Sequence, residues 1–344
     1  MQPTYSPTRR PVRRQPQSDT PRVEAGSAPE PVAVVIVSWN SRDYLEGCLS
    51  SLERLQRPPE QIVVVDNGSI DGTPAWLAQR FPEIDVVALN ENAGFCRANN
   101  LGIGRTHTPF VLVLNPDTEL NSDFLRRLLP AFDDSRVGIA CGKLLRFDRE
   151  TLDSAGQQLG RSRQPLDRGY GTRDTGRYDR DETVFGACGA AALYRRAMLD
   201  SIVDEGGQYF DEEFFAFVED LDLAWRARRL GWCSAYRYEA VGYHARGSSA
   251  SGPPWRRRVA AMLGRSAEVR FHVVKNRYLT IMRNDSVAGY CLNLPFIWAR
   301  DLGTLALLLV SSPQVLLRLW RERAVFSRAR GKRRLDAGRP RAQF

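Results

Sequence analysis

The sequence is poor in cysteine and histidine, and neither residue type is arranged for disulfide or zinc chemistry. Its six cysteines are scattered without a CxxC pair, and its three histidines form no cluster of zinc-ligand spacing with them. We therefore expect free, buried thiols in a protein that works in a reducing compartment.

The glycine-rich and nucleophile motifs of several large α/β enzyme classes are also absent. The turn after the first expected strand reads SWNSRDY, and it has no glycine where a dinucleotide-binding fold needs G-x-G-x-x-G. Neither a Walker phosphate-binding loop nor a G-x-S-x-G elbow occurs in the chain. These absences argue against dehydrogenase, phosphate-loop and α/β-hydrolase chemistry.

Long apolar runs are missing as well. Residues 287–319 are largely apolar, but the run is interrupted by Pro295, Arg300, Asp301 and Pro313. Its longest unbroken part, LGTLALLLV, has nine residues, whereas a membrane-spanning helix needs roughly 20. We therefore do not expect the chain to span a membrane. Residues 1–30 contain arginines and prolines but no apolar core, so they are expected to be a disordered leader and not a signal peptide.

Basic charge is concentrated near the end of the chain. Residues 251–344 contain 19 Lys or Arg and 5 Asp or Glu, which leaves 30 against 35 for residues 1–250. A basic helix at 266–283 followed by apolar segments fits attachment to an anionic membrane surface, and a helical cap packed on the main domain is the alternative. Arginine-rich tails also bind nucleic acid, but the apolar segments favour the membrane, so we expect no nucleic-acid partner.

The first half of the chain alternates between buried β-branched runs and amphipathic helical segments. Strands are expected at 32–39, 61–66, 85–90 and 110–117, with helices at 41–55, 73–81, 94–105 and 122–133. This alternation predicts an α/β fold with a mainly parallel central sheet flanked by helices. A further strand is expected at 137–147, and the polar stretch 148–182 is interpreted as a surface excursion that covers a substrate.

Asparagine or aspartate stands at the end of each of the first four expected strands. The residues are Asn40, Asp66, Asn67, Asn90, Asn92, Asn115 and Asp117. Ligands of open α/β sheets bind beyond the carboxyl ends of the strands, so these side chains are candidates for one site. A rim of carboxylates and amides suits a divalent cation together with a sugar or a nucleotide.

Six segments resemble one known family in the same order. They read VVIVSWN, VVVDNGSIDG, NENAGFCRANNLGI, FVLVLNPDTEL, FDEEFFAFVEDLDLAWRARRLGW and HARGSS. Together they resemble the family 2 inverting glycosyltransferases of the GT-A fold, most closely the bacterial rhamnosyltransferase-type branch, over residues 31–250. The resemblance implies a nucleotide-diphosphate sugar donor, a Mg²⁺ or Mn²⁺ cofactor and a single displacement that inverts the anomeric carbon. Residues 251–344 are expected to form the basic and apolar helical extension described above, with membrane association favoured.

The resemblance also implies roles for individual residues at the donor site. Asp66 is expected to contact the nucleotide base or ribose. The other expected donor-binding residues are Asn40, Asn67, Asn92, Gly94, Phe95, Asn100, Asn115, Arg246 and Ser248. Asp117 matches the last aspartate of the family's DxD metal motif, and His244 matches its metal or diphosphate ligand. The sequence departs from the family in NPD, where Asn115 replaces the first aspartate, so the cation is expected to depend on Asp117 and His244.

Three carboxylates lie in the stretch FFAFVEDLDLAWRARRLGW at 214–232. At about 100° per residue, Phe217, Leu221 and Trp225 share one helix face, which predicts that this face is buried. Asp222 precedes Arg226 by four residues, as in a helical ion pair. By resemblance, Asp220 is the catalytic base, and Glu219 orients an acceptor hydroxyl or shares the local charge.

These features together predict an inverting glycosyltransferase at the cytoplasmic face of the cell membrane. The favoured donor is dTDP-L-rhamnose, with a UDP-hexose as the alternative. The expected acceptor is a glycan or a polyprenyl-linked saccharide in cell-envelope polysaccharide synthesis. A catalytically inactive GT-A domain that serves as a binding module is the competing hypothesis.

Overall fold

A ten-stranded sheet forms the core of the computed structural model, which describes residues 30–245, 260 and 262–344. Its main order is β10-β12-β6-β11-β4-β1-β2-β3, and Pro31–Phe344 form one compact unit. The predicted leader and the boundary predicted at residue 250 lie outside the described residues.

The four strands predicted from buried runs lie side by side and are mutually parallel. They are β1 (Val32–Ser38), β2 (Gln61–Asp66), β3 (Asp85–Ala88) and β4 (Phe110–Leu114). β11 (Ala191–Arg195) runs antiparallel between β4 and β6 (Val137–Arg146), and β12 (Cys233–His244) is parallel to β6. β10 (Glu182–Val184) forms an antiparallel edge. The predicted α/β class with a mainly parallel sheet is therefore confirmed.

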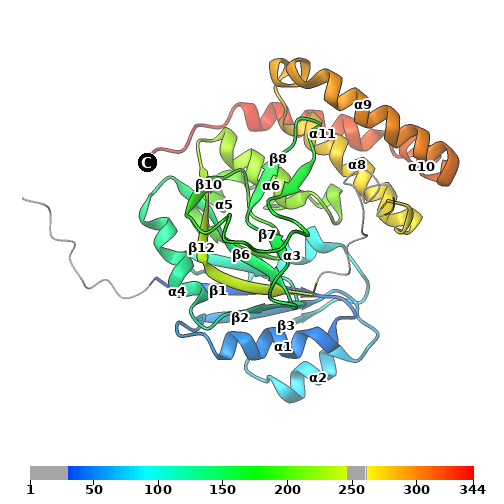
Figure 1. The fold of residues 1–344 in the computed structure, drawn as a ribbon. Coiled ribbons are helices and arrows are strands. Elements are labelled where there is room, and N and C mark those ends of the chain that lie inside the picture. The colour runs from blue at the N-terminus through cyan, green and yellow to red at the C-terminus, as the bar shows by residue number, and fades with distance from the viewer. Residues whose placement is uncertain (1–29, 246–259, 261) are drawn as a thin grey trace, which may run out of the picture. The chain divides into compact units, whose positions relative to one another are not determined.

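Helices cover both faces of this sheet because alternate strand residues point to opposite sides. α1 (Arg42–Glu53) and α4 (Phe124–Leu128) pack against Val34 and Ile36, and η1 (Leu129–Asp133) continues α4. α3 (Phe95–Gly104), α5 (Arg196–Ile202) and α6 (Glu219–Arg229) belong to the other core, which includes Val35. α2 (Thr73–Arg80) lies beside α1 in Figure 1.

The polar stretch 148–182 is more ordered than the sequence analysis expected. It forms β7 (Leu152–Ser154), which pairs with β6, and a hairpin of β8 (Gln157–Leu159) and β9 (Pro165–Asp167). All three residues of β7 are buried. The interpretation of this stretch as a surface excursion was therefore wrong for β7, which adds to the central sheet.

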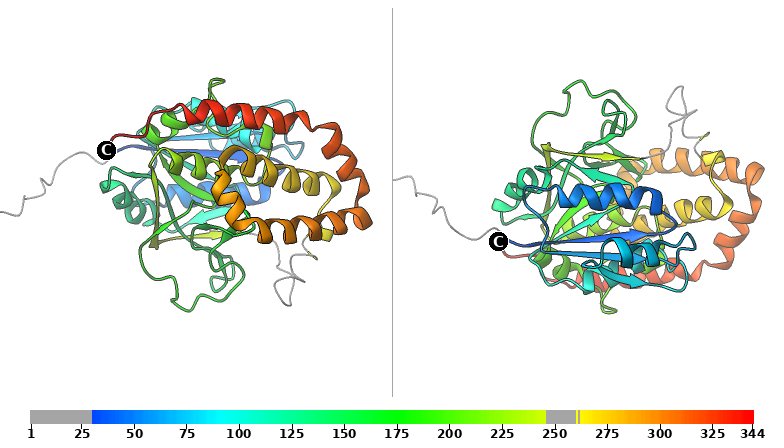
Figure 2. Two further views of the ribbon diagram at one scale, coloured as in Figure 1. Left: turned by 90° about the horizontal axis from the view of Figure 1, so that it is seen from above. Right: turned by 90° about the horizontal axis from the view of Figure 1, so that it is seen from below.

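Four helices form most of the described chain from residue 267 onward. They are α8 (Ala267–Asn284), α9 (Val287–Ser311), α10 (Pro313–Arg321) and α11 (Ala324–Ala337). Seen from above in Figure 2, α8 lies between α9 and α11. α11 packs on α8, and the last residues reach α6, where the Ala342 N–H donates to the Leu230 carbonyl and Phe344 meets Trp232 edge to face.

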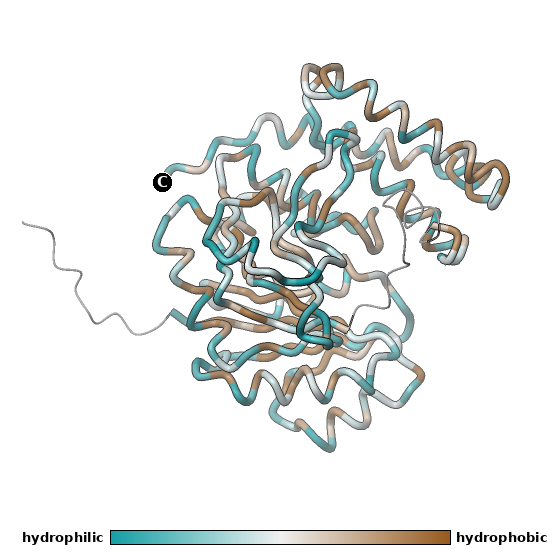
Figure 3. The backbone as a smooth tube through the Cα atoms, in the orientation of Figure 1, coloured by the Kyte–Doolittle hydropathy of each residue, from teal (hydrophilic) through white to brown (hydrophobic). Residues whose placement is uncertain are grey.

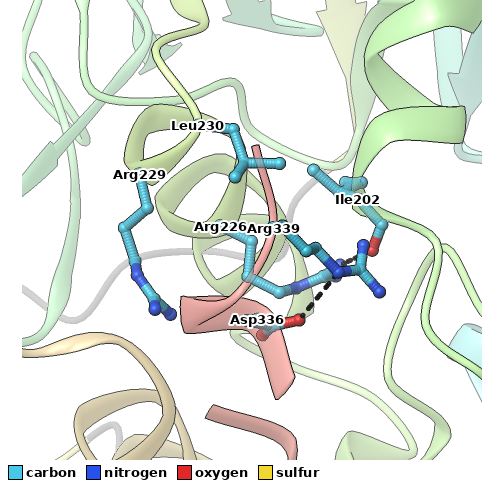
Figure 4. Close-up of a pocket in the computed structure, with 6 residues that line it drawn as sticks. All are labelled: Ile202, Arg226, Arg229, Leu230, Asp336 and Arg339. Atoms are coloured by element: carbon cyan, nitrogen blue, oxygen red, sulfur yellow. Dashed lines mark hydrogen bonds and ion pairs between the residues drawn. The ribbon is translucent and has the colours of Figure 1, made fainter. Parts of the chain in front are cut away.

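Arg339 and Asp336 also lie beside α6. Figure 4 shows Arg226 donating to the Ile202 carbonyl next to the Asp336–Arg339 pair, around a cavity of only about 10 Å³. The end of the described chain is thus closely packed on the helix that carries the three candidate carboxylates.

The length of α9 differs from the predicted interruption of the apolar run. α9 continues for 25 residues through Pro295, although an interior proline removes one hydrogen bond and costs a helix about 3 kcal/mol. By length and composition it is able to cross a membrane, with a mean hydropathy of 1.4 in its most apolar window and 11% of that window buried. The expected interruption, and the length argument against spanning that depended on it, were wrong. Figure 3 shows apolar residues recurring along α9.

Candidate active site

Asp66 ends β2 and is the one carboxylate among the predicted donor-binding residues. It is 1% exposed, and its Oδ2 accepts a hydrogen bond from the Ser69 N–H at 3.1 Å. Among the described residues its Oδ1 has no hydrogen-bond partner. A buried carboxylate oxygen without a partner is costly unless a ligand donates to it, so Asp66 is suited to a ribose hydroxyl or a base N–H.

Asn40 follows β1 and shapes the neighbouring turn. It has a positive φ of 50°, which asparagine tolerates better than most residues. Its N–H donates to the Ser69 hydroxyl, and its Oδ1 accepts from the Ile70 N–H, both at 2.9 Å. Asn40 and Asp66 therefore hold the same turn, at residues 69–70.

The remaining predicted donor-site amides on this side bind protein groups. Asn67 donates to Asn92 Oδ1 at 2.9 Å and accepts from the Ala93 N–H, while Asn92 Oδ1 also accepts from the Gly94 N–H. Asn100 donates to the Phe210 carbonyl and accepts from the N–H groups of Tyr209 and Phe210. These amides fix the loops that surround the start of α3.

Gly94 and Phe95 lie where that start of α3 meets the segment before α6. Gly94 has a φ of +90°, and a Cβ added there would lie 2.6 Å from the Phe215 ring. Phe95 contacts Phe210 edge to face, with ring centroids 6.4 Å apart. Only glycine fits this backbone conformation and this close approach.

Asp117 and His244 are brought together by strand pairing. β5 (Thr118–Leu120) pairs antiparallel with the end of β12, so that Thr118 lies opposite His244. His244 Nε2 lies 3.2 Å from Asp117 Oδ1, and His244 Nδ1 lies 2.8 Å from Asp153 Oδ2. The predicted pair is thus adjacent, and a third residue, Asp153 of β7, lies behind it.

Asp153 was missed by the sequence analysis because nothing near it in the chain distinguishes it. It is fully buried, and it lies 91 residues before His244. Burial disfavours a charged imidazole, but the hydrogen bonds to Asp117 and Asp153 outweigh this effect and raise the pKa of His244 to about 9.

The Asp117 and His244 side chains fit a divalent cation that replaces the proton on His244 Nε2, because a histidine must be neutral to bind a metal. An imidazole whose second nitrogen bonds a buried carboxylate is the usual arrangement of a metal-binding histidine. Among the described residues no group of three or more His, Cys, Asp or Glu is placed to hold a metal. The protein would therefore supply two ligands, Asp117 and His244. The other ligands would be oxygens of a bound diphosphate and water.

Asn115 links this pair to the start of α6. Its N–H donates to the Ala190 carbonyl at 2.9 Å. The preceding residue, Gly189, donates its N–H to Asp220 Oδ2 at 3.0 Å. Gln157 Nε2 donates to the same Asp220 oxygen at 2.7 Å. The Leu221 N–H donates to the other oxygen, Asp220 Oδ1, at 2.7 Å, so neutral donors on both oxygens orient the Asp220 carboxylate.

One short segment, residues 153–157, contacts both the Asp117–His244 pair and Asp220. Asp153 bonds His244, and Gln157, four residues later, bonds Asp220. Gln157 is 3% exposed, so its contact with Asp220 is shielded from water. Like Asp153, it was missed by the sequence analysis, because the contact joins residues 63 positions apart.

The segment before α6 has an unusual backbone. Phe215, Phe217 and Val218 all have positive φ, between 66° and 74°. Asn276 of α8 donates to the carbonyls of Phe214, Ala216 and Phe217 at 2.7–2.9 Å. Such conformations cost about 1–3 kcal/mol each and persist only where surrounding contacts impose them.

The three carboxylates of α6 are in different environments. Asp222 is fully buried and pairs with Arg226 at 2.8 Å, which confirms the predicted ion pair. It also accepts from Asn284 of α8 at 2.7 Å. Glu219 is buried, and burial followed by repulsion from Asp220 raises its pKa to about 8. Asp220 is half-buried.

The predicted buried face of this helix was only partly correct. α6 begins at Glu219, so Phe217 lies before the helix and is 42% exposed. Leu221 is buried and Trp225 is half-buried. The prediction failed for Phe217 because helical spacing in the sequence does not reveal the left-handed backbone that precedes the helix. Arg246 and Ser248, predicted to bind the donor, lie outside the described residues.

Comparison with known proteins identifies relatives of this chain. The model of the family described as glycosyl transferase family 2 matches residues 33–203. An N-acetylglucosaminyl-diphospho-decaprenol L-rhamnosyltransferase of Mycobacterium tuberculosis is 30% identical over 246 residues, which are 64% of this chain and 78% of that protein.

Solved structures share the fold at low sequence identity. GalNAc-T7 with UDP, GalNAc and Mn²⁺ has a TM-score of 0.54 and 13% identity, covering 74% of this chain and 48% of that one. The mannosyltransferase PcManGT from Pyrobaculum calidifontis, in complex with GDP-Man and Mn²⁺, has a TM-score of 0.50 and 16% identity, covering 90% and 85%.

Proposed function

The chain belongs to glycosyl transferase family 2 and is a glycosyltransferase of the GT-A fold, and we propose that Asp220 is its catalytic base. The observation that carries this proposal is the setting of Asp220. Its carboxylate is half-buried and oriented by Gln157 and Gly189, and Gln157 belongs to the segment that also orients His244.

In this mechanism the acceptor hydroxyl gives its proton to the Asp220 carboxylate as its oxygen attacks the anomeric carbon of the donor sugar. The bond between that carbon and the diphosphate oxygen breaks, and the nucleoside diphosphate leaves with the bonding electrons. Asp66 binds the nucleoside, and Glu219 orients the acceptor hydroxyl or shares the local charge. Asp117 and His244 would hold a divalent cation, which would supply positive charge to the leaving diphosphate.

We propose dTDP-L-rhamnose as the donor and a polyprenyl-linked saccharide as the acceptor. The support is the mycobacterial relative, whose name gives an L-rhamnosyltransferase that acts on a decaprenol-linked sugar. A panel of purified nucleotide sugars, with and without Mn²⁺, tests the donor. Stabilisation and hydrolysis are expected with dTDP-L-rhamnose, and a response limited to UDP-hexoses would replace this proposal by its alternative.

We further propose that the enzyme is peripheral at the cytoplasmic face of the cell membrane. α9 exposes Leu292, Trp298 and Leu309, which supports contact with lipid. Spanning is disfavoured because Asp301 near the middle of α9 pairs with Arg277 of α8, which fixes that part of α9 to the protein. A charge at the bilayer centre would also cost several kcal/mol. Carbonate extraction of membranes distinguishes a peripheral protein, which is released, from a spanning one.

The variant Asp220→Asn tests the base. Its side chain keeps the shape and one acceptor oxygen but does not take up a proton, so transfer is expected to be lost while the stabilisation by nucleotide sugar remains. Asp133→Asn removes an exposed carboxylate at the end of η1 and is the matched control, with unchanged transfer. If Asp220→Asn loses donor binding together with transfer, Asp220 belongs to the donor site and not to the acceptor side.

A further inference from the structure

A second cavity lies away from the candidate active site, among the tail helices. It has a volume of about 540 Å³ and lies between the end of α8, the start of α9 and α11. α11 contributes Arg330, Arg333 and Arg334 to its wall. The opposite wall is largely apolar and includes Ile281 of α8 and Ile297 of α9.

The carboxylates of this cavity are already neutralised by other side chains. Asp285 accepts two hydrogen bonds from Arg163, at 2.6 and 3.1 Å, and Asp301 pairs with Arg277. Arg163 and Arg277 do not belong to the arginine group of α11. The positive charge of that group is therefore not cancelled by the acidic residues of the cavity wall.

Two of the three arginines are available for a ligand. Arg333 donates to the Met282 carbonyl at 3.3 Å, which ties it to the end of α8. Arg330 and Arg334 are exposed, and within the described residues neither makes an ion pair. Two guanidinium groups one helical turn apart are well suited to oxygens of a phosphate group, which they bind through paired N–H donors.

The apolar wall continues into the exposed surface of α9. α9 contributes Val287 to the cavity wall, and Val287 is itself 76% exposed. Leu302 and Leu309, further along the same helix, are also exposed. A ligand with a phosphate at the arginines and long apolar chains along α9 would match both parts of this surface.

We propose that this cavity binds the phosphate group of an anionic membrane phospholipid. The proposal rests on the membrane association proposed above and adds a specific site to it. Basic pockets between apolar helices at the cytoplasmic face have the charge and depth that lipid head groups require. A sulfate or phosphate free in solution would use the arginines but not the apolar surface of α9.

The site is connected to the candidate base by the β8–β9 hairpin. Gln157, the first residue of β8, bonds Asp220. Arg163, in the turn of the same hairpin, bonds Asp285 and the Gly289 carbonyl at the cavity. Binding of a head group there would orient the hairpin, and with it the acceptor side of the active site, relative to the bilayer.

The test is co-sedimentation of the full chain with phosphatidylcholine vesicles that contain or lack phosphatidylglycerol. Arg330→Gln with Arg334→Gln removes the two available cavity arginines. Arg321→Gln with Arg341→Gln removes the same charge from exposed tail positions outside the cavity wall and is the matched control. The cavity variant is expected to lose roughly tenfold or more of its affinity for anionic vesicles, and the control less than about threefold.

The other outcomes overturn the proposal. Equal losses in the two double variants would mean diffuse attraction to anionic lipid without a specific site. Equal binding of the unaltered chain to both vesicle types would exclude a head-group site, although attachment through α9 would stand. If the unaltered chain binds neutral vesicles that contain a polyprenyl phosphate but does not bind vesicles that contain phosphatidylglycerol, the cavity is a site for the lipid-linked acceptor. The double variant Leu302→Asp with Leu309→Asp separately tests attachment through α9, because loss of that attachment would remove binding to both vesicle types.

Discussion

The tail helix α8 is expected to control the catalytic segment through Asn276. Asn276 is completely buried, and its Nδ2 faces the carbonyls of Phe214, Ala216 and Phe217. The substitution Asn276→Asp changes the volume very little but replaces the donor with a carboxylate oxygen. Three backbone carbonyls would then face an acceptor in place of a donor.

The cost follows from the number of hydrogen bonds that one amide is able to make. Its NH₂ group has two hydrogens, so two of the three contacts are full hydrogen bonds. Each contributes about 1 kcal/mol, and a buried carbonyl left without a donor costs about 1–3 kcal/mol. We expect Asn276→Asp to destabilise the protein by about 2–4 kcal/mol, which lowers the Tm by at least roughly 4 °C.

The same change is expected to lower activity beyond its effect on stability. Without Asn276 the positive φ values of Phe215, Phe217 and Val218 are free to relax, and Asp220 follows two residues after Val218. A small displacement of a catalytic group reduces kcat by roughly ten- to a hundredfold. The assay combines sugar transfer at a temperature well below the Tm with thermal unfolding, with and without nucleotide sugar. Donor-induced stabilisation should persist, because Asp66 is on a different element.

Asn293→Asp is the matched control on α9. Asn293 donates only to the Gly289 carbonyl of its own helix, at 2.9 Å, so the same chemical change should alter neither kcat nor the Tm by much. If Asn276→Asp keeps kcat within about twofold and Tm within about 1 °C of the unaltered protein, then α8 does not hold the catalytic segment and this reasoning is refuted.

Three further predictions concern the site itself. In the folded protein Glu219 keeps its proton up to about pH 8, whereas in the unfolded chain it releases the proton near pH 4.5. The free energy of unfolding should therefore fall as the pH rises from 4.5 to 8. Glu219→Gln should flatten this fall, as measured by urea unfolding at several pH values. Gly94→Ala should cost about 2–4 kcal/mol in urea unfolding, because its Cβ would meet Phe215 at 2.6 Å in a left-handed conformation, and an unchanged midpoint would contradict the close contact. Asp66→Ala should weaken nucleoside diphosphate binding by roughly tenfold or more in calorimetry, with no change expected for Asp43→Ala on the outside of α1.

Features that depend on neighbouring residues in the chain were predicted well. The β-branched runs at β1 and β2 gave buried parallel strands, because a strand covered on both faces is apolar throughout. The spacing of four between Asp222 and Arg226 gave their ion pair, since a helix alone brings such residues together. Ordered motifs identified the family, and the resemblance, not the periodicity, indicated Asp220.

Features that depend on long-range packing were not available from the sequence. Asp153 and Gln157 look like ordinary residues of a polar stretch. They orient His244 and Asp220 only because β7 pairs with β6, the neighbour of β12, and because β8 reaches the start of α6. α9 was expected to be broken at Pro295, because local rules count a proline against a helix but do not include packing such as the ion pair between Asp301 of α9 and Arg277 of α8.

The arrangement of residues along the chain was therefore enough to predict the four adjacent parallel strands, the family and the rim of asparagine and aspartate at the ends of those strands. Each of these follows from hydrophobic periodicity and from short motifs, which act over a few residues. The folded structure determined which carboxylates have partners, because burial and hydrogen bonding join residues far apart in the chain. It also placed α8 beneath the segment before α6, where Asn276 holds a backbone conformation that those residues would not adopt by themselves.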